Sequence, residues 1–220
     1  MECTKLLSQV LGDVMVLDVG GATTDVHSVT EDSEEISRIL ISPEPKAKRT
    51  VEGDLGVYVN RQKVIQSIGE EKLRSDLRTV GLDLHQLLDD YHAIPKTEGE
   101  IKLVERLTLE AVVRAVERHA GRVRYVYGPS GRSTLAQGKD LTQVKYIVGT
   151  GGALTHLPHG KDILKEVTRR NDNGMMLTPG DHAEILLDHH YIMASLGVLS
   201  LKYPQAALGL LEKSLGREIT

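Results

Sequence analysis

The chain has 220 residues, of which 40% are hydrophobic and 26% charged, and its formal net charge is −4 at pH 7. This composition is typical of a globular protein with one large domain, or one domain with a small insert. The negative charge and the absence of Phe and Trp argue against nucleic-acid binding, and no apolar run reaches the roughly 18 residues of a membrane span. A single cysteine, Cys3, excludes an internal disulfide framework, and the N-terminus lacks the apolar core of a signal peptide, so we expect a cytoplasmic protein.

Hydrophobic periodicity and turn residues divide the rest of the chain into elements. In chain order they predict a helix at 1–11, a hairpin at 14–28, a strand at 36–42, a solvated basic loop at 46–49, helices at 55–68, 70–80 and 82–91, a long helix at 100–120, strands at 123–127 and 146–148, helices at 153–157 and 162–170, a short edge strand at 175–177, and helices at 186–202 and 205–215. Strands followed by alternating helix and strand indicate an α/β layered fold with a mixed sheet.

Prolines and glycines bound the helical region in the first half of the chain. Pro43 and Pro45 precede it, and Pro95 with Gly99 follows it. We therefore expect residues 1–50 and 99–220 to form one lobe, and residues 51–98 to form a small inserted helical subdomain.

The hairpin carries the most informative pattern of the chain. An apolar strand ends in Asp18 and meets a turn at Gly20 and Gly21, and the β-branched partner strand follows with Thr23, Thr24 and Asp25. Glycine takes backbone angles closed to other residues, and such a turn can direct several N–H groups toward one anion, most often a phosphate. The two aspartates could then hold a hydrated Mg²⁺ or orient an attacking water. A tight hairpin with solvated aspartates is the alternative.

A second glycine pair follows the buried strand at 146–148. The pattern Gly149-Thr150-Gly151-Gly152-Ala153 matches only the first two glycines of a dinucleotide-binding fingerprint, because Leu154 stands at the third position. We expect no dinucleotide site there. A Walker-type phosphate loop is also absent, since Asp140 follows Lys139 where Ser or Thr is required.

Three segments resemble motifs of the superfamily that contains actin, sugar kinases and heat-shock-chaperone ATPases. Its second phosphate loop is similar to Leu-Asp-Val-Gly-Gly-Ala-Thr-Thr-Asp-Val-His-Ser at residues 17–28, its adenosine motif is similar to residues 145–154, and the acidic start of its inserted subdomain is similar to residues 52–56. The amino-acid sequence of residues 17–28 most resembles that of the MutL family, the accessory proteins of adenosylcobalamin-dependent glutamate mutase. No match to the first phosphate loop occurs, so the resemblance covers the second lobe only.

The resemblance implies a ribonuclease-H-like lobe of an ATP-dependent reactivating factor for a cobalamin-dependent mutase of the glutamate or methylaspartate type. It implies ATP and Mg²⁺ as cofactors, and ATP hydrolysis only in the two-lobed protein, with a missing N-terminal lobe or a homodimer partner completing the site. The implied roles are catalysis by Asp18 and Asp25, Mg²⁺ binding through water by Asp18, phosphate contacts by Gly20, Gly21, Thr23 and Thr24, nucleoside contacts by Gly151, Gly152 and Ala153, and contacts near the ribose or hinge by Glu52 and Asp54. A hydantoinase or oxoprolinase subunit that activates an amide by phosphorylation, and an actin-like structural ATPase, are the alternatives.

Overall fold

A computed structural model describes residues 1–129, 131–169 and 174–218. Its helices and strands are α1 (Glu2–Leu11), β1 (Val14–Val19), β2 (Thr24–Val29), α2 (Glu34–Ser37), β3 (Ala47–Glu52), α3 (Arg61–Ile68), α4 (Glu70–Arg78), α5 (Leu84–Asp89), α6 (Glu98–His119), β4 (Arg122–Gly128), β5 (Gly131–Gln137), β6 (Tyr146–Thr150), α7 (Gly152–Thr155), α8 (Gly160–Arg169), β7 (Glu184–Leu187), α9 (Met193–Ser200) and α10 (Pro204–Leu215).

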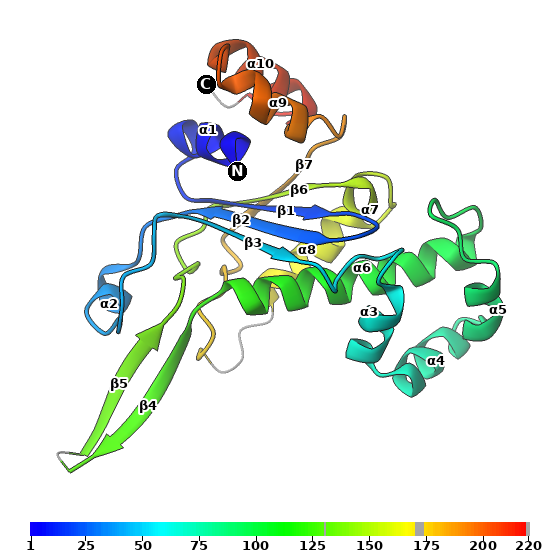
Figure 1. Cartoon of the computed structure of the whole chain (residues 1–220), viewed down its shortest axis with the longest axis horizontal. Helices are drawn as coiled ribbons and strands as arrows, with labels where there is room; N and C mark the ends of the chain where they lie inside the picture. The colour runs from blue at the N-terminus through cyan, green and yellow to red at the C-terminus, as the bar shows by residue number, and fades with distance from the viewer. Residues whose placement is uncertain (130, 170–173, 219–220) are drawn as a thin grey trace.

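Five of the strands form one mixed sheet in the order β3-β2-β1-β6-β7. The β1–β2 and β2–β3 pairs are antiparallel, whereas the β1–β6 and β6–β7 pairs are parallel. Helices lie on both sides of this sheet, α1, α9 and α10 on one and α6 and α8 on the other (Figure 1). The predicted α/β class and the mixed sheet are therefore confirmed.

Alternate side chains of β1 enter two separate apolar clusters. Val14 and Val16 pack with residues of α1, α9 and α10, whereas Met15, Leu17 and Val19 pack with residues of α6 and α8. Because both faces of this strand are buried, its sequence is a continuous apolar run up to Asp18 rather than an alternating one.

Helix α6 begins with a capping box. The Thr97 hydroxyl accepts a hydrogen bond from the Glu100 N–H at 3.2 Å, and the Glu100 carboxylate accepts one from the Thr97 N–H at 3.0 Å. Its buried stripe includes Leu103, Leu107 and Ala111, as the periodicity predicted. None of the described helices is both long and apolar enough to cross a membrane.

Helices α3, α4 and α5 lie together beside one end of α6 (Figure 1). Their buried residues, among them Val64, Leu73 and Leu84, belong to the same apolar cluster as the stripe of α6. Helix α3 begins at Arg61, so the first part of the helix predicted at 55–68 is a loop with turns. The subdomain boundaries at 51 and 98 stay a prediction.

The strand predicted at 36–42 is wrong. Residues 34–37 form α2, whose first turn is capped by Ser33, and the third strand of the sheet is β3, in the basic stretch that was expected to be a loop. Strand β3 lies at the edge of the sheet, where charged side chains are tolerated because one side of the strand faces solvent. Its apolar alternation is correspondingly weak.

The helix predicted at 186–202 is wrong in its first part, because residues 184–187 form β7 and α9 begins only at Met193. A short apolar run does not distinguish a buried strand from a helix. At 175–177 the structure has an isolated bridge between Arg122 and Met176, not a strand, and β5 was not predicted. Arg170, the last residue of the helix predicted at 162–170, lies outside the described residues.

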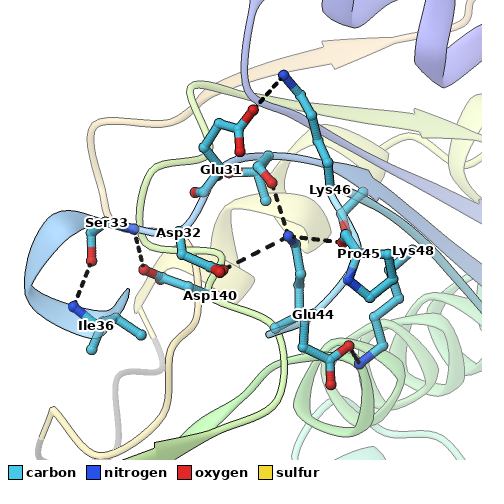
Figure 2. Close-up of polar contacts among 12 residues, drawn as sticks. Glu31, Asp32, Ser33, Ile36, Glu44, Pro45, Lys46, Lys48 and Asp140 are labelled. Atoms are coloured by element: carbon cyan, nitrogen blue, oxygen red, sulfur yellow. Dashed lines mark hydrogen bonds and ion pairs between the residues drawn. The ribbon is translucent and has the colours of Figure 1, made fainter. Parts of the chain in front are cut away.

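Strands β4 and β5 pair with each other and form a ribbon that projects from the rest of the molecule (Figure 1). Isolated bridges from Arg122 to Met176 and from Ala136 to Leu40 join its base to the rest of the chain. Directly after the ribbon, Lys139 is 1% exposed. Its ammonium donates to the carbonyl oxygens of Thr30 at 2.8 Å and Pro45 at 3.1 Å, and lies 3.8 Å from the Asp32 carboxylate (Figure 2). The base of the ribbon is thus fixed to the loop between β2 and β3 by a buried cation.

Stability should fall in mild acid because of His119 at the end of α6. This buried ring bonds Ser28 Oγ at 2.8 Å and Thr50 Oγ1 at 2.9 Å, and burial lowers its pKa from 6.5 to about 3. The unfolded chain therefore binds a proton below pH 6.5 that the folded protein binds only near pH 3. We expect His119 to lower the free energy of unfolding by roughly 1.4 kcal/mol per pH unit across this window.

Urea unfolding between pH 7 and pH 4 measures this dependence, and His119→Gln should make it shallower. Burial also lowers the pKa of His27, to about 4, so part of the slope should remain in the variant. An unchanged slope in His119→Gln would assign the whole effect to other groups.

Candidate functional site

Both glycine pairs lie beyond strand ends at the same edge of the sheet. Strands β1 and β6 run parallel with Asp18 opposite Thr150, and β2 runs antiparallel with Asp25 opposite Asp18. Parallel strands end at a common edge, where ligands of α/β sheets bind. The register therefore brings the hairpin tip beside the Gly151-Gly152 turn.

The hairpin tip is held by the loop before α3. The Gly20 carbonyl accepts from the Val57 N–H at 3.2 Å, and the Gly21 carbonyl accepts from the N–H groups of Tyr58 at 2.9 Å and Val59 at 2.7 Å. The side-chain amide of Asn60 donates to the Ala22 carbonyl at 2.8 Å. All three carbonyls of the tip are thus bonded within the protein.

Most N–H groups of the tip, unlike its carbonyls, form no hydrogen bond within the described residues. The Gly20 N–H donates to the Thr23 carbonyl, but those of Gly21, Ala22 and Thr23 have no acceptor among the described residues. A turn with bonded carbonyls and free N–H groups presents partial positive charge, which suits an anion.

The glycines of the hairpin do not act through unusual backbone angles. Neither Gly20 nor Gly21 has φ in the left-handed region, which corrects that part of the sequence argument. Gly151 does, with φ of 87°, and a Cβ there would lie 2.6 Å from Asp18 Oδ1 and overlap the Val19 carbonyl. Among the four glycines of the two turns, Gly151 is therefore the one where a side chain is not tolerated, and it lies at the contact between the two motifs.

A cavity of about 330 Å³ lies between the two glycine turns. Four of the predicted site residues line it: Gly20, Gly21, Gly152 and Ala153. Its other walls are largely apolar and come from the loop before α3, the segment before α6, α6 itself, the residues directly after α7 and the loop before α9: Val57, Ala93, Ile94, Pro95, Ile101, Val104, His156, Leu157 and Tyr191. The largely apolar lining beside a turn with free N–H groups suits a ligand that has both an apolar part and an anionic part.

The two aspartates line a second cavity, of about 270 Å³, on the side of the sheet that faces α1 and α9. The Asp25 carboxylate is hydrogen-bonded within the protein. Its Oδ1 accepts from Nη2 and Nε of Arg49 at 2.7 Å and 3.1 Å, and its Oδ2 accepts from the Thr23 hydroxyl at 3.2 Å. Asp18 has no hydrogen-bond partner among the described residues and is partly buried. Burial, and then the carboxylates of Asp25 and Asp188, raise the pKa of Asp18.

A carboxylate with a raised pKa and no bonded partner is a signature of a functional position. Because folding disfavours the charged form of Asp18, we expect Asp18→Asn to raise the free energy of unfolding at pH 7.5, on the order of 1 kcal/mol. The gain should shrink as the pH falls toward 3.8, the ordinary pKa of the group, because Asp18 is then protonated in the folded state. Thermal unfolding at pH 7.5 and pH 4.5 tests this, with the exposed Asp162→Asn as control. A loss of stability at pH 7.5 would contradict it.

The remaining predicted residues do not line either cavity. Thr24 is buried, and its hydroxyl donates to the Leu55 carbonyl at 2.8 Å. Glu52 and Asp54 both accept hydrogen bonds from Arg118 of α6, at 2.6 Å and 2.7 Å. These contacts fix the loop after β3 onto α6. Within the described residues, no group of three or more His, Cys, Asp and Glu side chains could hold a metal by itself.

Sequence reasoning missed Asp188, Arg49 and Tyr191. Asp188 is fully buried after β7 and accepts hydrogen bonds from Thr150 Oγ1 at 2.8 Å, from the Met193 N–H at 2.9 Å and from the Ser214 hydroxyl. It thereby ties the end of β6 to the start of α9. Tyr191 lines the first cavity with φ of 51°, a strained value for a non-glycine residue. The position of Asp188 directly before two histidines was the available signal, but the helix predicted at 186–202 concealed it.

A family model described as "MutL protein" matches residues 1–215. The chain belongs to the MutL protein family. It is 35% identical over 211 residues to "Protein MutL" of Clostridium tetanomorphum, and this match covers 93% of the chain but 46% of the relative. The chain thus spans about half the length of the curated MutL relative. The MutL family, predicted from the sequence of residues 17–28, is confirmed.

Proposed function

We propose that this protein is the nucleotide-binding lobe of an accessory factor that uses ATP to reactivate adenosylcobalamin-dependent glutamate mutase. The observation that carries this proposal is the hairpin tip, whose free N–H groups stand beside a cavity shared with the second glycine turn. Membership of the MutL family supports the role toward the mutase. We propose for the lobe the ribonuclease-H-like fold of actin and chaperone ATPases.

The chemistry of the site fits ATP. The phosphates bind at the N–H groups of Gly21, Ala22 and Thr23, and the nucleoside occupies the apolar cavity against Gly152 and Ala153. No aromatic platform is needed for the base, since aliphatic side chains and glycine backbone surround it.

The site offers Mg²⁺ one available carboxylate rather than two. Mg²⁺ is commonly held by one or two carboxylates together with waters and substrate phosphates, and here it neutralises phosphate charge. Asp18 is the carboxylate available for this, through water, because Asp25 already binds Arg49. Asp25 keeps Arg49 and Thr23 in place beside Asp18. Phosphoryl transfer depends mainly on such positioning and charge compensation.

Hydrolysis acts on the partner by changing the geometry of the lobe. Asp188 bonds both Thr150, directly before the second glycine turn, and the first turn of α9, so a shift at the turn moves α9. After this helix, Leu201 is 72% exposed, as is Val198 within it, and they offer an apolar contact to the rest of the full-length protein. The motion drives exchange of damaged cobalamin in the mutase for intact cofactor.

Calorimetric titration of Mg·ATP into the full-length protein, with phosphate release followed in the presence and absence of glutamate mutase, tests the proposal. We expect binding that Asp18→Asn weakens tenfold or more and that Asp162→Asn leaves unchanged, and we expect phosphate release to increase with mutase. Hydrolysis that ignores the mutase would instead favour an amide-activating ATPase. Absence of nucleotide binding would leave the glycine turn a plain hairpin.

A further inference from the structure

The β4–β5 ribbon exposes side chains that proteins usually bury or pair. Tyr127 is 76% exposed, and Tyr125 and Val126 are each 48% exposed. Toward the tip, the outer edges of both strands have no backbone partner among the described residues. Two-stranded ribbons bury little surface of their own and are marginally stable when isolated.

The ribbon is also positively charged in an acidic chain. It contains Arg122, Arg124 and Arg132, and residues 121–138 include no Asp or Glu, whereas the whole chain has a net charge of −4. None of the three arginines forms an ion pair within the described part of the chain. The Arg132 guanidinium lies 4.6 Å from the centroid of the Tyr125 ring, which orders both side chains on one face.

The base of this exposed ribbon is fixed firmly. The Ala136 N–H donates to the Ile39 carbonyl at 2.8 Å, and the Val123 N–H donates to the Met175 carbonyl at 2.7 Å. Below them, buried Lys139 holds the loop before β3, and Asp140 accepts from the Ser33 N–H at 2.9 Å (Figure 2). The fold therefore uses buried charged groups to hold an exposed ribbon in one orientation, which lowers the entropy lost when the ribbon binds a partner.

We propose that the β4–β5 ribbon is a docking arm that binds an acidic surface of the mutase, an inference that rests on the proposed function. Tyrosine and arginine are the residue types that most often dominate the energy of protein interfaces. Three arginines that form no ion pair within the described residues and have no neighbouring acid favour a partner of negative charge. A nucleic acid is disfavoured, because a polyanion extending past the ribbon meets a chain of net negative charge.

The test is the affinity of the full-length protein for purified glutamate mutase, measured by surface plasmon resonance at low and high salt. We expect Arg124→Glu/Arg132→Glu to weaken binding at least tenfold and Tyr127→Ala to weaken it severalfold. The control Lys72→Glu/Lys161→Glu, at exposed positions of α4 and α8, makes the same change in net charge and should alter the affinity less than twofold. Mg·ATP binding should be the same in all variants.

The outcomes separate the two proposals. Ribbon variants that bind the mutase like the wild type overturn the docking arm and leave the proposed function standing. A wild type that binds Mg·ATP but not the mutase overturns the proposed function and the arm together. Ribbon-dependent self-association in sedimentation, or ribbon-dependent binding of an oligonucleotide, assigns the surface to another partner and also overturns the arm.

Discussion

Replacing Gly151 with alanine is expected to destabilise the protein by about 3 kcal/mol or more and to abolish Mg·ATP binding. With φ of 87° and ψ of 148°, this residue has backbone angles that cost a side chain roughly 1–3 kcal/mol. The added Cβ would also lie 2.6 Å from Asp18 Oδ1 and overlap the Val19 carbonyl, so β1 and β6 must separate where the two glycine motifs meet. Urea unfolding measures the first effect and calorimetric titration the second.

The neighbouring substitution Gly152→Ala is the matched control. A Cβ at Gly152 would meet only His156 Cδ2, at 3.9 Å, and the residue begins α7, where alanine is favourable. We expect its unfolding free energy to stay within about 0.5 kcal/mol of the wild type. Equal stabilities for the two variants would contradict the strain assigned to Gly151.

The central strands β1, β2 and β6 could be predicted because local sequence patterns specify them. The β1–β2 hairpin has its turn residues between two strands adjacent in the chain, and β6 is a buried apolar run that ends in glycine. The parallel register that places Asp18 opposite Thr150 is not local, and it was not predicted.

Two of the errors, at β3 and β7, concern strands whose pairing partners are not adjacent in the chain, whereas β5 was missed although its partner β4 directly precedes it. Strand β3 is an edge strand rich in charge, and its identity depends on its pairing with β2. Strand β7 is four residues long and becomes a strand only beside β6. Arg49 lies in β3, and Asp188 comes directly after β7. Because neither strand was predicted, the sequence analysis could not place either residue beside Asp18.

The structure places the predicted site residues around two separate cavities, which the motifs did not indicate. The glycine turns and Ala153 form one apolar cavity, whereas Asp18 and Asp25 line another across the sheet. Gly151 is the point of contact, since only the absence of its side chain lets the turn lie against the Asp18 carboxylate. Gly151 therefore lies between Gly152, which lines the first cavity, and Asp18, which lines the second.

Replacing Lys139 with methionine should lower the free energy of unfolding by about 3–5 kcal/mol, the usual effect of removing one partner from a buried ion pair. The ammonium is the donor for the Thr30 and Pro45 carbonyls and the nearest cation to Asp32, whose Oδ1 is buried without a hydrogen bond. Burial lowers the pKa of Lys139, but the carboxylates around it favour its charged form. Methionine fills a similar volume, so the loss arises from the unpaired oxygens rather than from a void.

Urea unfolding of Lys139→Met beside the exposed Lys161→Met separates this effect from loss of a surface charge, and the control should change by less than about 0.5 kcal/mol. Adding Asp32→Asn to Lys139→Met should restore part of the stability, because it removes the charge left without a partner. Hydrogen exchange of the β4 and β5 amides should accelerate in Lys139→Met, since the ammonium anchors the ribbon to the β2–β3 loop. Unchanged exchange would show that the backbone contacts of Ala136 and Val123 hold the ribbon without it.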